Sequence, residues 1–257
     1  MNIVTEDVQE PVHQPVVDKV NGMFSNRKAI FLIFLTIVGY MAVRWVVYSV
    51  TEGLYGQFFI RDNLMTIPRL VGFVFILWIG WRQRPGHYLD FSFKKARVSL
   101  FIFFIWILID LLTLIDHPFL SRSLKLSIVF ALTTIPVALF EETLFRGALL
   151  HELRNLGLKL WSVPVSALIF ALFHFQAITI DLWPNIFFWG IVAGALRYYK
   201  ASMCWLVLMH WGLDYLALFV GMSKTGISYW LQLVASSVLA VSLLWYVKAE
   251  STREHKL

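Results

Sequence analysis

The sequence predicts an all-α polytopic membrane protein with about eight transmembrane helices and a site in a polar cavity within the helix bundle. Hydrophobic residues make up 59% of the 257 residues, charged residues only 15%, and the mean hydropathy is +0.70. A soluble domain of this length carries about a quarter charged residues, which argues against a soluble protein with a large core. The apolar runs are long and do not alternate with polar residues, so a membrane β-barrel is excluded as well.

Each predicted helix follows from an apolar run, since about 20 such residues cross a bilayer. The runs cover about 29–50, 66–81, 98–115, 126–146, 161–180, 185–199, 203–220 and 229–247. If the N-terminus is cytoplasmic, the loops on that side hold most of the lysines and arginines, which is the usual asymmetry of membrane proteins. We therefore expect both termini in the cytoplasm. The positively charged loop residues then fix the orientation of the protein in the membrane, and the formal charge of +6 does not indicate nucleic-acid binding.

No shift in composition divides the chain, and we expect a single membrane domain. Residues 1–28 are polar and predict a mobile N-terminal cytoplasmic tail. A helical transmembrane domain then covers 29–248, with a motif-bearing core at about 126–220. Residues 249–257 form a short C-terminal cytoplasmic tail in this interpretation.

Several polar or small residues inside the apolar runs predict specific contacts with other parts of the chain. Arg44 interrupts the first run, and we expect it to snorkel or to pair inside the bundle. Asp110 in the third run is a site candidate by position, although a solvated helix end is the simpler interpretation. Gly190 and Gly194 form a small-xxx-small pattern, which predicts a close approach of two helices.

The most informative stretch ends the fourth run and contains Glu141, Glu142 and Arg146. Charged groups lose their hydration inside a bilayer, so three of them together in an apolar run suggest a function. Glu142 and Arg146 are four residues apart and can pair on one helix face. Glu141 lies about 100° round the helix and is free to face another element. A solvated helix end would explain the same pattern without any chemistry.

Two further polar pairs occur at helical spacing in later apolar runs. Phe170 and His174 lie in the fifth run, and His210 and Asp214 lie in the seventh. A single histidine on an apolar helix is usually a packing residue with a satisfied hydrogen bond. Two histidines on separate membrane helices, together with Glu141, indicate a shared cavity in the cytoplasmic half of the bilayer.

Such a cavity suits hydrolysis by an activated water. No serine stands beside a histidine at motif spacing, so a covalent nucleophile is not indicated. A glutamate and a histidine can hold and deprotonate a water, and a second histidine can stabilise an oxyanion. The same donors could bind Zn²⁺, but no His-Glu-x-x-His spacing is present, and we do not favour a metal.

The three motifs, in this order and on separate helices, resemble those of the CPBP family of intramembrane proteases. That family includes the CAAX prenyl endopeptidases and the bacterial abortive-infection and bacteriocin self-immunity proteins. The resemblance covers about 126–220 and extends to Phe-Arg-Gly-Ala-Leu-Leu after the glutamates and Phe-Ala-Leu-Phe-His at the second motif. It implies a metal-independent glutamic-type endopeptidase with eight helices, without a cofactor, in a bacterial inner or plasma membrane.

The resemblance also implies roles for the individual residues. Glu141 and His174 would activate the water, and His210 with residue 214 would form the oxyanion site. Glu142 and Arg146 would hold the first motif in shape, and Phe170 would pack near His174. An ionised carboxylate cannot donate a hydrogen bond to an oxyanion. Asp214 must therefore be protonated or else orient His210, and we favour the second role.

We expect the substrate to be a membrane-associated or lipidated peptide or protein, presented from the bilayer near its cytoplasmic face. Membership of a family does not demonstrate turnover, so a non-catalytic membrane immunity or assembly factor is the alternative. A transporter using the intramembrane glutamate and histidines is a third hypothesis. Broken helices with Gly or Pro in corresponding halves of the chain would favour that hypothesis, and the sequence shows no matching halves.

Overall fold

The computed structural model describes residues 15–52, 57–83, 88, 96–116, 120, 123–174, 180–220 and 226–254. Regular structure in these residues is entirely helical, which confirms the predicted fold class. The elements are α1 (Pro15–Val50), α2 (Gln57–Gln83), α3 (Ala96–Leu111), η1 (Leu112–Ile115), α4 (Leu124–Glu142), η2 (Thr143–Leu149), α5 (Leu150–Leu153), η3 (Arg154–Leu158), η4 (Lys159–Trp161), α6 (Ser162–Phe173), η5 (Ile180–Leu182), α7 (Trp183–Tyr198), α8 (Met203–Val220) and α9 (Gly226–Glu254).

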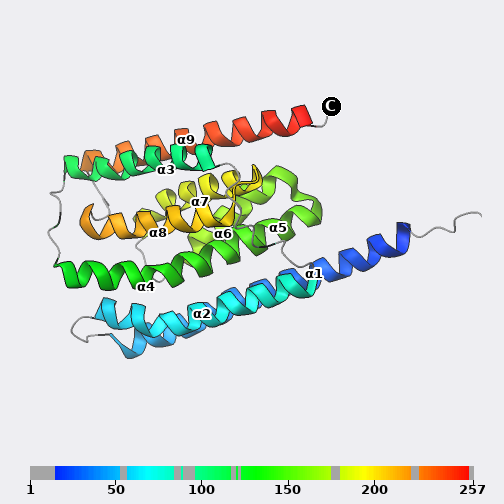
Figure 1. Cartoon of the computed structure of the whole chain (residues 1–257), viewed down its shortest axis with the longest axis horizontal. Coiled ribbons are helices and arrows are strands. Elements are labelled where there is room, and N and C mark those ends of the chain that lie inside the picture. Colours follow the sequence, from blue (N-terminus) through cyan, green and yellow to red (C-terminus); the bar gives the residue numbers. More distant parts are fainter. Residues whose placement is uncertain are drawn as a thin grey trace, which may run out of the picture.

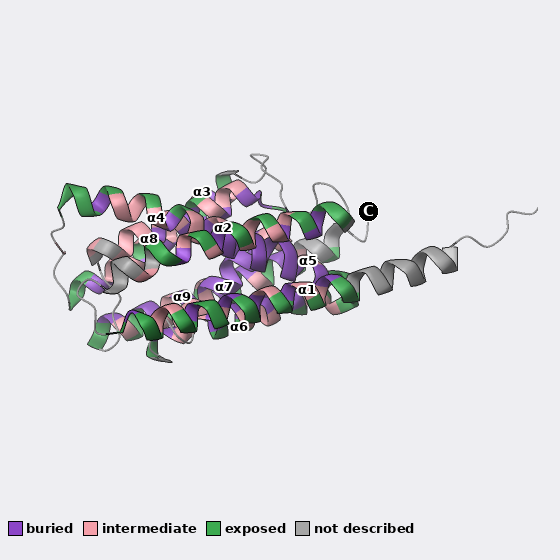
Figure 2. Cartoon of the chain, turned by 90° about the horizontal axis from the view of Figure 1, so that it is seen from below, coloured by how far each residue is buried: buried purple, intermediate pink, exposed green. Residues whose placement is uncertain are grey.

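The helices run side by side along the long axis of the molecule (Figure 1). In this view α1 and α2 lie along one edge, α3 and α9 lie along the other, and α4 to α8 lie between them. Figure 2 shows the buried residues concentrated in the middle of the bundle, around α5 and α7. The outer helices instead expose large apolar side chains, such as Val38 and Trp45 on α1 and Val241 and Trp245 on α9. This apolar exterior suits contact with lipid tails.

Every predicted apolar run contains a helix in the described residues, although the fifth run, 161–180, is helical only as far as Phe173, and 175–179 lie outside the described residues. Five segments of the described residues are long and apolar enough to cross a membrane. They are Arg27–Val50, Asn63–Arg82, Arg97–Ile115, Leu124–Phe173 and Gly226–Ala249. The fourth segment reverses direction near Gly157 (φ 91°) and holds the fourth predicted run and most of the fifth. α7 and α8 cover the two remaining runs, and the count of eight spans stays a prediction.

The helix bounds correct two expectations. Helix α1 begins at Pro15, so residues 15–28 are helical where the sequence predicted a mobile tail. Proline is favoured at a first helical position because its missing N–H would have no partner there. Residues 1–14 lie outside the described residues.

The second correction concerns the fifth run, for which the sequence predicts helix to about residue 180. Helix α6 ends at Phe173. The His174 ring nitrogen Nδ1 lies 2.8 Å from the Phe170 carbonyl oxygen, which a continuing helix would offer to the backbone N–H of His174. That N–H bonds to the Ala171 carbonyl instead, so a local side-chain contact competes with the helix and ends it.

The close approach predicted at Gly190 is confirmed between α7 and α6. A Cβ added at Gly190 would lie 2.9 Å from the Cβ and 3.0 Å from the Cα of Ala167, and one added at Gly194 would lie 3.1 Å from Val163 Cγ1. Ala167 is held by its own backbone, so it cannot move aside as a flexible side chain would. The two glycines therefore allow α7 to pack directly on α6, the helix that His174 follows.

We expect Gly190→Val to destabilise the fold, because overpacking a tight interface costs about 1–3 kcal/mol. Thermal unfolding in detergent should show a lower melting temperature for this variant. Gly39→Val on α1 is the matched control, since a Cβ there meets nothing within 4 Å. Equal melting temperatures for the two variants would contradict the packing argument.

Asp116 joins the end of η1 to the start of α9. Its Oδ2 accepts a hydrogen bond of 2.7 Å from the backbone N–H of Ser228, in the first turn of α9. A Cβ on Gly226 would lie 2.6 Å from the same oxygen, and Gly226 has a φ of +85°, which favours glycine. The carboxylate therefore caps α9 from another part of the chain.

Asp116→Ala should lower the free energy of unfolding by about 1 kcal/mol, which is the usual cost of losing an N-terminal cap. Thermal melts of the purified variant would measure it. Asp181→Ala in η5 serves as the control, because the Tyr229 hydroxyl donates its hydrogen bond to the backbone carbonyl of Asp181, which the substitution keeps. A melting temperature unchanged by Asp116→Ala would show that the cap contributes nothing.

Candidate active site

The first motif lies where α4 passes into a π-helical turn. Glu141 and Glu142 end α4, and all seven residues of η2 (Thr143–Leu149) are buried. Ser166 Oγ of α6 donates a hydrogen bond of 3.1 Å to the Phe145 carbonyl oxygen in this turn. Such wide turns occur often at functional sites, because they change the direction of side chains within a continuous helix. Here the turn is fixed against α6, the helix that carries the second motif.

Glu141 faces the two histidines of the later motifs. Its Oε2 lies 3.4 Å from His174 Nε2 and 3.8 Å from His210 Nε2. The three side chains come from α4, the end of α6 and α8. The fold therefore brings the three polar residues into one cluster, although the sequence separates them by 33 and 36 positions.

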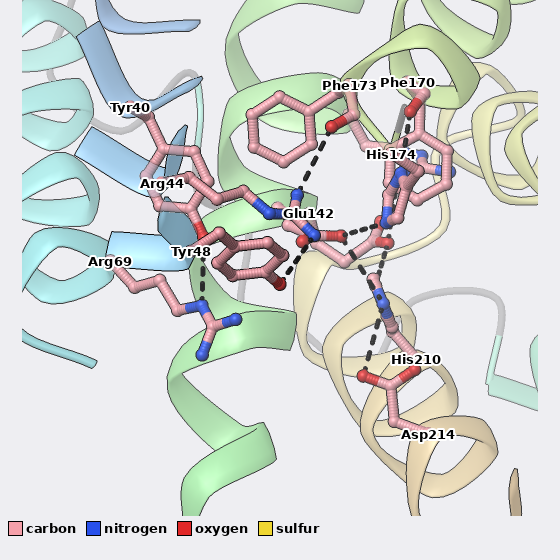
Figure 3. Close-up of polar contacts among 12 residues, drawn as sticks. Tyr40, Arg44, Tyr48, Arg69, Glu142, Phe170, Phe173, His174, His210 and Asp214 are labelled. Atoms are coloured by element: carbon pink, nitrogen blue, oxygen red, sulfur yellow. Dashed lines mark hydrogen bonds and ion pairs between the residues drawn. The ribbon is translucent and has the colours of Figure 1, made fainter. Parts of the chain in front are cut away.

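Glu142 joins two partners. Its Oε1 lies 3.1 Å from Arg146 NH1, the contact that the spacing of four predicts, and 2.7 Å from His210 Nδ1 (Figure 3). The side chain of Glu142 is fully buried. Sequence reasoning missed the contact with His210, because no local pattern connects residues 68 positions apart. Glu142 thus contacts both the arginine of the first motif and the histidine ring of the third.

The partners of Nδ1 fix which ring nitrogen of each histidine carries a proton. A carbonyl oxygen only accepts hydrogen bonds, so His174 Nδ1 donates its proton to the Phe170 carbonyl. Glu142, paired with Arg146, likewise accepts the proton of His210 Nδ1. In the neutral rings both Nε2 atoms then carry a lone pair, and both point at Glu141.

Phe170 supports this arrangement from one side. Its ring centroid lies 4.6 Å from that of His174, and the Arg146 guanidinium lies 4.1 Å above its face. A cation over an aromatic face gains electrostatic attraction, more so away from water. Phe170 therefore contacts His174 and also the arginine of the first motif.

Asp214 lies at the more exposed end of the cluster. Its Oδ2 is 3.6 Å from His210 Nε2, and its side chain is 29% exposed, against 7% for His210. Asp214 thus contacts the nitrogen that faces Glu141, while Glu142 holds the other ring nitrogen. Asp110 is next to last in α3 and partly buried, and it interacts electrostatically with Asp214, so it lies beside the site.

Residues of α1 and α2 also face the cluster, and the motifs gave no sign of them. Arg44 is 5% exposed and Arg69 is 6% exposed. Arg44 therefore lies inside the bundle, which is one of the two positions expected for it. The signal that could have found this face is the spacing of four between Tyr40, Arg44 and Tyr48, which places three polar groups on one side of an apolar helix.

A loop residue closes the outer side of the π turn. The Tyr88 hydroxyl donates a hydrogen bond of 2.8 Å to Glu152 Oε1, and the Tyr88 carbonyl oxygen would lie 3.0 Å from a Cβ on Gly147. Burial, and then the Glu152 carboxylate, raise the pKa of the Tyr88 phenol, so the phenol stays protonated and donates. Gly147 is needed because a side chain there would meet this backbone.

Comparison with known protein families identifies the region that holds the motifs. Residues 123–216 match the family model described as type II CAAX prenyl endopeptidase Rce1-like. The chain carries an Rce1-like domain. This match confirms the resemblance to the CPBP family over the part of the chain that builds the cluster, and it supports a membrane protease of the CAAX type. Neither the curated proteins nor the solved structures gave a match.

The Rce1-like domain supplies all of the motif residues but not the whole surroundings of the site. The matched residues run from just before α4 into α8, whereas α1, α2, α3 and α9 lie outside them. The integral membrane character follows from both the match and the apolar segments. Among the described residues, no group of three or more His, Cys, Asp or Glu side chains is arranged to hold a metal ion.

Proposed function

We propose that this protein is an intramembrane glutamic-type endopeptidase that hydrolyses a peptide bond of a membrane-associated or lipidated substrate. The observation that carries the proposal is the position of Glu141 Oε2 opposite the Nε2 atoms of His174 and His210, at 3.4 and 3.8 Å. The Rce1-like match supports the reaction class. The roles of the individual residues rest on the geometry and on elementary acid–base chemistry.

Water activation is assigned to Glu141 and His174. A water can lie about 2.8 Å from both Glu141 Oε2 and His174 Nε2, since these acceptors are 3.4 Å apart. Each proton of that water then has an acceptor, and the oxygen lone pair is free to attack the substrate. Glu141 takes one proton as the O–H bond breaks and the oxygen bonds to the carbonyl carbon.

Oxyanion stabilisation is assigned to His210. Its Nδ1 proton is committed to Glu142, so a protonated Nε2 is the ring's donor toward the substrate oxygen. The carboxylates of Glu141 and Asp214 lie 3.8 and 3.6 Å from this nitrogen, and both stabilise a positive charge on the ring. Asp214 assists in this way without donating a hydrogen bond itself.

Collapse of the tetrahedral intermediate completes the reaction. The carbonyl reforms, the carbon–nitrogen bond breaks, and the proton held by Glu141 passes to the leaving amine. The new acid still carries the second proton of the water, which passes to the amine, so the products are a carboxylate and an ammonium group, and Glu141 is ionised again. All protons are exchanged between the water, Glu141 and the substrate, so the proposed reaction needs no cofactor and no metal ion.

The test is hydrolysis by the purified protein in lipid vesicles, using an S-prenylated peptide with a reporter group and mass spectrometry of the products. We expect cleavage at one peptide bond, at the same rate with and without a strong chelator. Activity that a chelator removes and Zn²⁺ restores would contradict the metal-independent mechanism. Absence of cleavage from any prenylated or unmodified membrane-bound peptide would favour the non-catalytic alternative. We also expect both termini in the cytoplasm of a bacterial cell, which cysteine labelling from either side would test.

A further inference from the structure

The chain reverses direction between α5 and α6 at one end of the bundle, and this reversal is exposed. It consists of η3 (Arg154–Leu158) and η4 (Lys159–Trp161), and it turns at Gly157, which has a φ of 91°. Leu156 is 41% exposed and Trp161 is 75% exposed. Tryptophan is enriched where a bilayer meets water, so Trp161 places the reversal at the membrane boundary.

The ends of α7 and α9 lie beside this reversal. The guanidinium carbon of Arg154 lies 4.3 Å from the ring centroid of Tyr198, the last residue of α7. Tyr199 follows directly, and its hydroxyl oxygen lies 3.1 Å from that of Tyr246 in α9. Figure 1 shows the reversal and the C-terminal turns of α9 at the same end of the molecule. Three separate parts of the chain therefore form one surface.

The charge of this surface is positive. Residues 153–161, 197–203 and 241–249 contain five cations and neither aspartate nor glutamate. Four of the cations are exposed, and we call them the cationic surface: Arg154, Lys159, Lys200 and Lys248. Neither Arg154 nor Lys159 forms an ion pair with a carboxylate of the described residues. Cations that are not neutralised at the edge of a bilayer attract anionic headgroups.

Two of these lysines occupy backbone positions that favour glycine. Among the described residues, the non-glycine residues with a positive φ are Lys159 (φ 47°) and Lys200 (φ 68°). Lys159 also has a ψ of −127°, a combination that residues with a Cβ rarely adopt. A strained backbone conformation often marks a functional position. Both turns thus carry a positive charge at a conformational cost that glycine would avoid.

We infer that the cationic surface binds the headgroup phosphate of an anionic phospholipid, with Arg154 and Lys159 as the principal contacts. Arg154 meets the face of the Tyr198 ring, and this contact leaves guanidinium N–H groups that can donate to phosphate oxygens. Lys159 adds a second positive charge on the same reversal. The exposed Leu156 and Trp161 favour a lipid over a free anion, because they offer apolar contacts to its glycerol and acyl groups.

This inference names a lipid partner and does not depend on the proposed hydrolysis. Arg154 comes directly after α5 (Leu150–Leu153), and α5 follows the π turn η2 without a break. A lipid bound at Arg154 therefore restrains the chain just after the turn that carries the first motif. Because the folded protein presents this surface and the unfolded chain does not, the lipid should also stabilise the fold by mass action.

Lipid competition in native mass spectrometry tests the inference. The full chain in neutral detergent is mixed with dioleoylphosphatidylglycerol and dioleoylphosphatidylcholine, and the fraction of protein with one bound lipid of each kind is measured. We expect phosphatidylglycerol to bind about tenfold more tightly or better, because each cation near an anionic headgroup adds about fivefold in affinity. Arg154→Gln and Lys159→Gln should each lower that affinity about fivefold and leave phosphatidylcholine binding unchanged.

Lys125→Gln is the matched control, because it removes an exposed lysine from the first turn of α4, at the opposite end of the bundle (Figure 1). Its preference for phosphatidylglycerol should equal that of the unsubstituted protein. Equal affinity for the two lipids would overturn the inference. So would a preference that both Arg154→Gln and Lys159→Gln leave intact.

Lys159→Gly distinguishes the charge of this residue from its backbone conformation. Glycine relieves the strain at φ 47°, so this variant should melt no lower than the unsubstituted protein in neutral detergent. It should nevertheless lose about fivefold in affinity for phosphatidylglycerol, as Lys159→Gln does. Added phosphatidylglycerol should raise the melting temperature of the unsubstituted protein more than that of either variant. Inorganic phosphate that raises it equally would show a free-anion site and refute the lipid site.

Discussion

Glu141→Gln should reduce kcat/KM for peptide hydrolysis by about 100- to 10,000-fold, the range that a positioned general base contributes. The amide keeps the size of the side chain and can still contact His174 and His210, but it cannot take a proton from water. Substrate binding should therefore persist while turnover is lost. Initial rates in lipid vesicles, followed with a quenched peptide, measure the effect.

Glu152→Gln provides the matched control for that substitution. Glu152 is also a buried glutamate, at 1% exposure, but it lies in α5 and accepts a hydrogen bond from Tyr88. A glutamine oxygen can accept the same bond, so activity should stay close to that of the unsubstituted protein. Full activity of Glu141→Gln, or equal losses in the two variants, would rule out Glu141 as the base.

Arg146→Met should lower the free energy of unfolding by about 3–5 kcal/mol, because removing one partner of a buried ion pair leaves the other charge uncompensated. Methionine fills much of the same volume, so the loss of stability comes from the missing positive charge and not from a cavity. Glu142 would then keep only the contact with His210 Nδ1 and lose the guanidinium at 3.1 Å. Thermal unfolding in detergent should show a large fall in melting temperature.

The double variant Glu142→Gln/Arg146→Met distinguishes the effect of the lost ion pair from the effect of changed side-chain packing. It removes both charges, and the amide oxygen of the substituted side chain can still accept the proton of His210 Nδ1. We expect the double variant to be more stable than Arg146→Met alone, since no unpaired carboxylate remains buried. Losses that simply add would show that the two side chains stabilise the fold independently.

Much of the fold could be predicted because a helix that crosses a lipid bilayer needs a long run of apolar residues. Long apolar runs predicted helices, and the structure has a helix at each run. The spacing of four between Glu142 and Arg146 predicted their contact, and the spacing of Gly190 and Gly194 predicted a close helix approach. Each of these predictions depends only on local periodicity.

The rest depends on contacts between distant parts of the chain. Nothing near Glu142 in the sequence indicates that it contacts His210, and the spacing of four around Arg44 indicates a polar helix face without indicating which helices it meets. The end of α6 was missed for a different reason. The residues after His174 are apolar enough to continue a helix, and the competing contact from the ring is invisible to hydropathy.

The hydrogen bond from His174 Nδ1 to the Phe170 carbonyl also limits how protons can travel through the site. Turning the ring over would break that bond and leave a carbonyl without its partner at the end of α6. In the proposed mechanism the His174 imidazole therefore accepts a hydrogen bond through Nε2 alone, and it cannot carry a proton by rotating from one side of the cavity to the other. If the mechanism proposed above holds, the proton that Glu141 takes from water can therefore reach the departing amine only from Glu141 itself.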